Sequence, residues 1–166
     1  MKDILAGFFF FLFAACLFSF TKQGKLEPHL NWELPPSIVN CMEEEDLSYG
    51  NFEMAILFWE EIGHTFLFKE YKYDHRDDIC ELEDPKGLIL IKLSYDLGYF
   101  TLGKTERIYE NKSGKMIGAI IEINYMHVDD PLVLIHELGH AVGYGHTDQI
   151  GHIMNATRPN ADYHFY

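Results

Sequence analysis

Two segments of the chain repeat their hydrophobic side chains at the spacing of an amphipathic α-helix. The first spans residues 51–62, and Gly63 can end it because glycine readily takes the left-handed conformation of a helix C-terminus. The second runs from residue 131 to about residue 142, with proline in its first turn and Asp129 or Asp130 as the capping side chain. We therefore expect two main helices.

Most of the other hydrophobic positions fall in short runs that are typical of β-strands. We expect strands at residues 29–34, 65–71, 88–93, 99–108 and 116–123. The segments between these runs contain the turn formers glycine, proline, asparagine and aspartate. Strands combined with two helices in this order predict an α/β sheet domain.

The first twenty residues have a different pattern from the rest of the chain. Lys2 precedes a charge-free apolar run, and two alanines stand directly before Cys16. This pattern indicates an export signal over residues 1–20, then a tether at 21–27 and a domain at 28–166. The string FAAC resembles the lipobox of bacterial lipoproteins, in which the cysteine is lipidated. A lipoprotein signal, a cleaved signal peptide and an uncleaved membrane anchor all remain open.

Composition narrows the class of protein. A chain of 166 residues has room for one domain with a buried core. Its hydrophobic content of 48% and aromatic content of 15% are those of a globular protein rather than a disordered one. Lys and Arg number 13 against 26 Asp and Glu, which gives a formal net charge of −13. A surface of this sign repels phosphate backbones, so nucleic acid is excluded as a partner.

Cysteine usage agrees with export. If Cys16 is lipidated or removed, Cys41 and Cys80 are the two cysteines that remain. In an oxidising compartment an isolated pair of this kind is typical of a disulfide. Two separate free thiols are the alternative.

The string HELGHAVGYGH, from His136 to His146, carries the candidate chemistry. On a helix, His136 and His140 lie about 40° apart around the axis and one turn apart along it. Two neutral imidazoles with that spacing can bind one Zn²⁺, and a catalytic zinc site needs a third protein ligand. Gly143 can end the helix in a left-handed conformation and return the chain, so that His146 reaches the same metal.

Glu137 stands next to the first of these ligands. In this arrangement its carboxylate reaches a water molecule rather than the metal, and it can take a proton from that water as the water attacks a carbonyl. The same carboxylate can deliver the proton to a leaving amine. The predicted chemistry is hydrolysis of an amide bond with Glu137 as general base.

This string resembles the zinc signature of the metzincin clan, and most of all that of the matrixins, the matrix metalloproteinase family. The resemblance extends more loosely over residues 26–159. It implies a zincin fold with a mixed, twisted five-stranded sheet, two main helices, and an active-site helix followed by a Met-turn. Met154 follows His146 at a spacing similar to that of the matrixin Met-turn. Ordinary core packing is the alternative role for Met154.

The resemblance also implies how a substrate would bind. In the matrixin fold an antiparallel edge strand lines the cleft and pairs with an extended peptide. The corresponding residues here would be Leu102 and Gly103. The chain departs from the family at Asn155 and Ala156, where matrixins have Tyr-Pro, and so few residues follow Met154 that the C-terminal subdomain must be short.

Other candidate ligands have less support. His64 and His75 are too isolated to indicate a second zinc site, and His152 is expected in a loop, with substrate contact as its alternative. Asp77 and Asp78 could bind Ca²⁺, but adjacent acids of this kind are typical of a solvated loop, so calcium has no further support.

The sequence therefore predicts an exported zinc-dependent endopeptidase that acts on peptide or protein substrates, either secreted or anchored by lipid to the cell envelope. Two alternatives are a zinc- or peptide-binding envelope protein without turnover, and an amidase that acts on cell-wall peptides. The intact Glu137 favours an enzyme, because a binding protein does not need the base.

Overall fold

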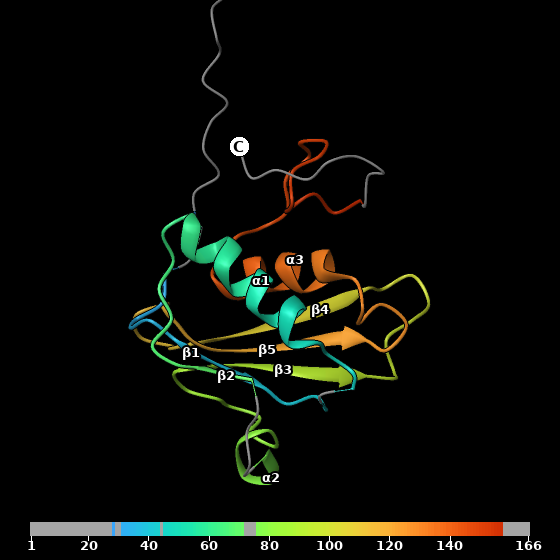
Figure 1. Cartoon of the computed structure of the whole chain (residues 1–166). Helices are drawn as coiled ribbons and strands as arrows, with labels where there is room; N and C mark the ends of the chain where they lie inside the picture. Colours follow the sequence, from blue (N-terminus) through green and yellow to red (C-terminus); the bar gives the residue numbers. More distant parts are fainter. Residues whose placement is uncertain (1–27, 29–30, 44, 72–75, 158–166) are drawn as a thin grey trace, which may run out of the picture.

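The computed structural model describes residue 28 and residues 31–43, 45–71 and 76–157 (Figure 1). These residues form a five-stranded sheet in the order β2-β1-β3-β5-β4. The strands are β1 Ser37–Asn40, β2 Lys69–Glu70, β3 Leu88–Ser94, β4 Gly103–Tyr109 and β5 Met116–Asn124. All neighbouring pairs are parallel except β4 and β5, so β4 is an antiparallel strand at one edge of a largely parallel sheet.

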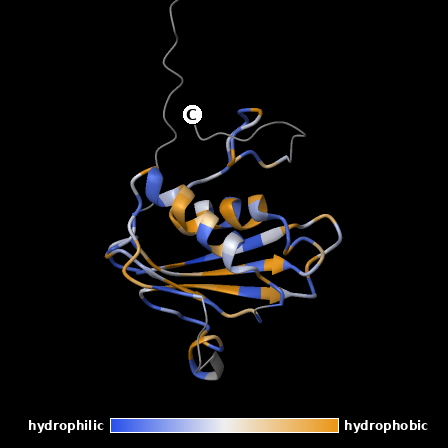
Figure 2. Cartoon of the chain, viewed as in Figure 1, coloured by the Kyte–Doolittle hydropathy of each residue, from blue (hydrophilic) through white to orange (hydrophobic). Residues whose placement is uncertain are grey.

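The two main helices pack together on one face of the sheet. They are α1 Tyr49–Glu61 and α3 Pro131–Ala141, and Figure 1 shows both lying above the strands, whereas the short helix α2 Arg76–Ile79 lies below. Strands β3 and β5 are hydrophobic along most of their length because both of their faces are covered. Figure 2 shows these hydrophobic residues in the strands and in the helices above them.

The main core lies between this sheet face and the helices. Its largest members with little or no solvent exposure include Trp59, Ile91, Ile121 and Leu138. A smaller cluster, with Val39 and Leu90, covers the opposite face of the sheet. The α/β class predicted from the hydrophobic pattern is therefore confirmed.

Several predicted elements agree with the structure. The runs at 88–93 and 116–123 are strands β3 and β5, and the two predicted helices are α1 and α3. Gly63 has φ of 109° and lies directly beyond the C-cap of α1, as expected. Asp130 is the N-cap of α3, since its side chain accepts a hydrogen bond from the backbone N–H of Leu132.

Other expectations were wrong in position. In the described part of 29–34 the regular pairing is limited to one bridge, between Trp32 and Met116, and Leu34 is exposed. The strand is instead β1, which begins directly after the two prolines. The predicted strand at 65–71 shrinks to β2, and α2 lies in a segment where we expected only a loop. Short alternations were misleading because pairing with a distant strand, rather than local pattern, decides which run joins a sheet.

Cys41 and Cys80 form a disulfide, which joins the end of β1 to the residue after α2. Among the described residues no helix combines the length and the apolar character needed to cross a bilayer. The predicted signal at 1–20, with Cys16, and the tether at 21–27 lie outside the described residues, as does His75.

Candidate functional site

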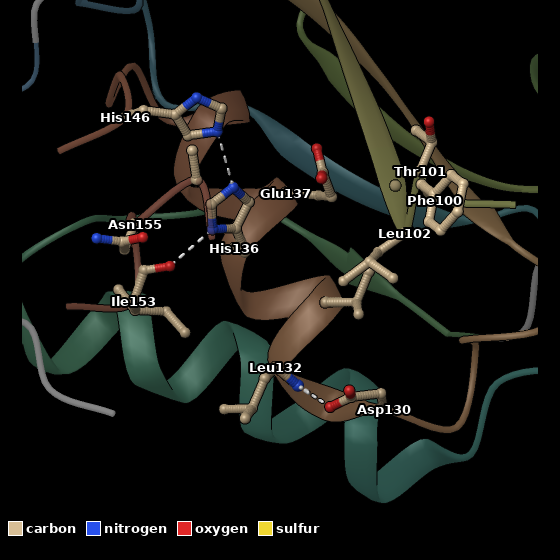
Figure 3. A pocket seen from close by; sticks show the side chains of 13 residues that line it. Phe100, Thr101, Leu102, Asp130, Leu132, His136, Glu137, His146, Ile153 and Asn155 are labelled. Atoms are coloured by element: carbon tan, nitrogen blue, oxygen red, sulfur yellow. Dashed lines mark hydrogen bonds between the residues drawn. The ribbon is translucent and has the colours of Figure 1, made fainter. Parts of the chain in front are cut away.

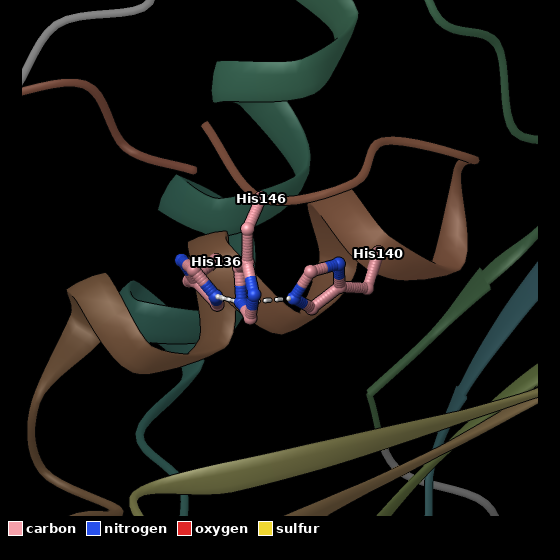
Figure 4. Close-up of side chains that lie close together, drawn as sticks. All are labelled: His136, His140 and His146. Carbon is pink, nitrogen blue, oxygen red and sulfur yellow. Dashed lines mark hydrogen bonds between the residues drawn. The ribbon is translucent and has the colours of Figure 1, made fainter. Parts of the chain in front are cut away.

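Helix α3 carries the first two histidines of the site. Asp130 caps its N-terminus and Pro131 occupies its first position, so the helix begins where the sequence predicts. His136 and His140 project from the same side of the helix, one turn apart (Figure 4). Their positions follow from helical geometry alone.

A turn after α3 brings the third histidine to the same point. Gly143 has φ of 111°, a conformation that glycine adopts without strain. Beyond it, His146 Nε2 lies 3.2 Å from His136 Nε2 and 3.0 Å from His140 Nε2 (Figure 4). The three histidines can each offer one nitrogen, and these nitrogens all lie within 4.8 Å of one another.

The nitrogen spacing suits a metal ion. Nitrogens at the usual bond length from a tetrahedral Zn²⁺ lie about 3.3 Å apart, close to the two separations at His146. The three side chains could therefore hold one metal ion. This set agrees with the ligands predicted from the sequence.

Backbone carbonyls fix the orientation of two of the rings. His136 Nδ1 lies 2.7 Å from the carbonyl oxygen of Ile153, and His140 Nδ1 lies 2.9 Å from that of Tyr144. A carbonyl oxygen only accepts, so each Nδ1 carries the proton and donates it. Each Nε2 then presents its lone pair to the shared centre, which is the tautomer a metal requires.

The surroundings also keep these rings neutral. Burial lowers the pKa of His136, and it lowers the pKa of His140 to about 4. The pKa of His146 is lowered as well, first by burial and then by the charges of His136 and Arg107. A neutral imidazole is the form that binds metal, so the three rings are in a protonation state that could bind a cation.

Glu137 is buried between α3 and the edge strand β4, with 6% of its surface exposed. Its Oε2 accepts a hydrogen bond of 2.7 Å from the hydroxyl of Thr105. A side chain at Gly103 would collide with it, because a Cβ there would lie 2.7 Å from Glu137 Cγ and 2.9 Å from Oε1. Gly103 and Thr105 thus form a slot in β4 that holds the glutamate side chain.

The surroundings of this slot also determine the pKa of the Glu137 carboxyl. Burial raises the pKa of this carboxyl to about 7, and the hydrogen bond from Thr105 and the charge of Arg107 act in the opposite direction. A group with a pKa near neutrality can both accept and return a proton at physiological pH.

Arg107, two residues further along β4, lies beside the second histidine. Its Nη2 donates to the carbonyl oxygen of Tyr144 at 3.1 Å and lies 3.1 Å from His140 Nδ1. The carbonyl of Tyr144 therefore interacts with both His140 and Arg107. Neither Thr105 nor Arg107 was expected at the site, because no local motif links β4 to the histidine string.

Met154 follows the histidines in the chain and is fully buried. It packs against α3 at Gly139, where an added Cβ would overlap the Sδ of Met154 and would lie 2.5 Å from Trp59 Cζ2. The backbone of the same segment carries the Ile153 carbonyl that orients His136. Met154 therefore packs directly against the helix that carries His136 and His140, and Gly139 leaves the space for its sulfur.

A cavity of about 450 Å³ opens beside this centre. Figure 3 shows Phe100 and Leu102 on one side of it, Ile153 and Asn155 on the other, and His136 and Glu137 between them. Leu102 and Gly103, predicted to border the cleft, both line this cavity. The structure thus brings the expected cleft residues together with the histidines.

The secondary candidates lie apart from this centre. His64 Nε2 lies 3.0 Å from the hydroxyl of Tyr144, and its ring packs against Trp59, as suits a histidine of the protein interior. His152 is buried and its Nδ1 accepts a hydrogen bond from the backbone N–H of Met154, so it shapes the turn. Among the described residues the histidine triad is the one cluster suited to a metal, and Asp78 is not part of it.

Comparison with known proteins adds no assignment: no protein-family model matches the chain, and no curated protein has a matching sequence.

Proposed function

We propose that the chain is a zinc-dependent endopeptidase of the metzincin type. The observation that carries this proposal is the convergence of three Nε2 atoms at metal-ligand spacing, with a buried glutamate on the same helix turn. Three neutral histidines without a thiolate are typical of a catalytic zinc site that keeps one position open. The buried Met154 and the antiparallel edge strand β4 support the metzincin class.

His136, His140 and His146 would hold the zinc ion, which would supply a Lewis acid able to polarise a carbonyl and to make water more acidic. The protein itself supplies the proton transfers. Glu137 Oε2 is held by Thr105, which leaves Oε1 to take a proton from the attacking water and to give it to the departing amine. The pKa of about 7 lets one carboxyl perform both transfers.

The free edge of β4 supports binding of an extended peptide. The backbone N–H of Asn124 donates to the carbonyl of Leu102, so the polar groups of Leu102 face β5. Because these groups alternate in direction along an antiparallel strand, those of Gly103 and Thr105 face the outer edge. A peptide that pairs there passes over Glu137, which lies in the slot formed by the same two residues.

We infer an exported location on two grounds. The Cys41–Cys80 bond is typical of an oxidising compartment. The apolar run within residues 1–20 has the pattern of an export signal, with lipidation at Cys16 as one outcome.

The decisive test measures zinc content and cleavage of a fluorescence-quenched peptide library for the chain and its Glu137→Ala variant. We expect one zinc per chain in both proteins, cleavage by the unaltered chain, and a loss of about a hundred- to ten-thousand-fold in the variant, the usual contribution of a general base. Chelation should abolish cleavage, and added zinc should restore it.

Other outcomes separate the alternatives. One zinc per chain with no cleavage by either protein would identify a zinc- or peptide-binding protein. Cleavage of purified cell-wall peptides, but of no protein or library peptide, would identify an amidase. Undiminished cleavage by Glu137→Ala would contradict the mechanism.

A further inference from the structure

Two adjacent aromatic side chains stand exposed at the mouth of the cavity. Phe100 is 93% exposed and Tyr99 is 73% exposed, and their rings meet edge to face with centroids 5.2 Å apart. We refer to this pair as the aromatic ridge. Neighbouring exposed aromatics are unfavourable in water, and such patches typically mark a site of interaction.

The ridge is held in a fixed position by a buried asparagine. Asn124 has no exposed surface, and its Nδ2 donates to the carbonyls of Thr101 at 2.9 Å and Gly98 at 3.4 Å. The N–H of Thr101 also donates to the carbonyl of Gly98, which closes the turn that carries the two rings. A loop fixed in this way presents a preformed surface, which lowers the entropic cost of binding.

The ridge is continuous with the candidate cleft. Phe100 lines the same cavity as His136 and Glu137, and the chain runs directly from Phe100 through Leu102 into the edge strand (Figure 3). A ligand on β4 that extends past Gly103 therefore meets the ridge next.

The direction of the peptide decides which part of it meets the ridge. Antiparallel pairing with β4 is favoured because antiparallel ladders are slightly more stable per residue than parallel ones. A peptide bound in this way runs opposite to the chain, so its residues beyond Gly103 towards Phe100 follow the scissile bond. The bond itself must lie over Glu137, which contacts Gly103 and Thr105. Three positions separate Gly103 from Phe100; the same number of residues in an extended peptide spans roughly 10 Å, and the turn at Gly98–Thr101 makes the distance along β4 no longer than that.

We propose that Tyr99 and Phe100 form a subsite for a large apolar side chain about three residues beyond the scissile bond, on the leaving-group side. This inference rests on the proposed endopeptidase function and narrows its substrates to peptides with an aromatic or long aliphatic residue at that position. Contact with such a side chain would cover the two rings, which are largely exposed within the part of the chain that the structure describes.

The test compares cleavage profiles of the zinc-loaded full chain and two matched variants, Phe100→Ser and Phe68→Ser. Phe68 is also an exposed phenylalanine, at 71%, but it lies just before β2 at the opposite edge of the sheet. Cleavage sites in a peptide library are mapped by mass spectrometry, and KM and kcat are measured on the best substrate.

We expect the chain and Phe68→Ser to favour large apolar residues about three positions after the bond. In Phe100→Ser the preference should disappear, with KM raised about 5- to 10-fold on the best substrate and kcat little changed. One zinc per chain in each variant verifies that the site is intact. Cleavage without this preference, or a preference that survives Phe100→Ser, would overturn the subsite while leaving the endopeptidase standing. No cleavage by the zinc-loaded chain would overturn both.

Discussion

At the scale of single residues, the site depends on where protons reside. His136 and His140 keep Nδ1 protonated through the carbonyls of Ile153 and Tyr144, and this frees Nε2 of each ring for a metal. Glu137 is the counterpart on the same helix, a carboxyl whose pKa rises to about 7 because it is buried. Each of these properties comes from a contact with another segment and can be tested by one substitution.

Replacing Glu137 by glutamine should stabilise the metal-free protein at alkaline pH. Because the pKa of Glu137 is raised from 4.5 to about 7, the folded chain holds this proton more tightly than the unfolded chain. Stability therefore falls as the pH rises between these values, by up to about 3 kcal/mol. We expect the unfolding free energy of Glu137→Gln to exceed that of the unaltered chain by about 1–3 kcal/mol at pH 8 and by much less at pH 5.

The measurement is denaturant unfolding of both proteins without metal at the two pH values. The histidines titrate in both proteins, so the difference between the proteins isolates Glu137. Glu106→Gln, on the exposed side of β4, is the matched control. An equal difference in unfolding free energy at both pH values would show that burial does not raise the pKa of the Glu137 carboxyl.

Thr105 should act as a positioning residue for the base. Thr105→Val removes the hydroxyl that bonds Glu137 Oε2 and keeps the shape of the side chain. We expect kcat to fall about tenfold with KM little changed, which corresponds to the loss of one charge-assisted hydrogen bond. This hydrogen bond lowers the pKa of Glu137, so the acidic limb of the kcat/KM profile should move to higher pH. Thr105→Ser should restore both kcat and the position of the acidic limb. A normal kcat and an unmoved acidic limb in Thr105→Val would show that Thr105 does not position Glu137.

At the scale of elements, helix α3 combines ligand placement with core packing. One side presents the histidines, and another contacts α1, where Trp59 Nε1 donates to the carbonyl of Ile135 at 2.8 Å. At the C-terminal end, Trp32 Nε1 donates to the carbonyl of Ala141 at 2.8 Å and satisfies one of the terminal acceptors. The ligand helix is therefore held at its middle and at its end by segments distant in sequence.

The close approach of α1 and α3 predicts a large effect for Gly139→Ala. The added methyl group would overlap Met154 and Trp59, so either the helix or the methionine turn must shift. We expect a loss of about 1–3 kcal/mol in unfolding free energy and weaker zinc binding. Gly50→Ala in α1 is the matched control, since no atom lies within 4 Å of the added group and alanine favours helices. Unchanged stability and zinc affinity in Gly139→Ala would refute this packing.

At the scale of the whole molecule, the sheet separates the candidate site from the disulfide. The face under α1 and α3 carries the site and the main core, whereas the opposite face carries the small cluster with Val39, Leu90 and the disulfide.

This separation predicts that the disulfide contributes to stability but not to metal binding. The bond joins residues 39 positions apart, and closing a loop of that length in the unfolded chain is worth about 2–4 kcal/mol. We expect the double change Cys41→Ala and Cys80→Ala to lower the unfolding free energy by that amount and to retain one zinc per chain. Calorimetry and metal analysis measure the two effects; loss of zinc at a temperature where the variant stays folded would contradict the prediction.

Local sequence was sufficient to place the three histidines that could hold a metal ion. His136 and His140 share a helix whose cap, proline and terminal glycine are all adjacent in the chain, and Gly143 needs only its own conformation to return His146. Helical geometry and one left-handed residue fix these positions, so no distant contact had to be known. The same reasoning fixed the helices and the two central strands, whose hydrophobic runs are long enough to be unambiguous.

Tertiary structure alone decided what surrounds the ligands. Thr105, Arg107 and the carbonyl of Ile153 reach the site because β4 pairs with β5 in one register and the chain after His146 folds back beneath α3. The first strand was misplaced for the same reason, since β1 is defined by its pairing with β3. Strand register and the path of the segment after His146 depend on contacts between residues far apart in sequence. The pattern of neighbouring residues does not identify those distant partners.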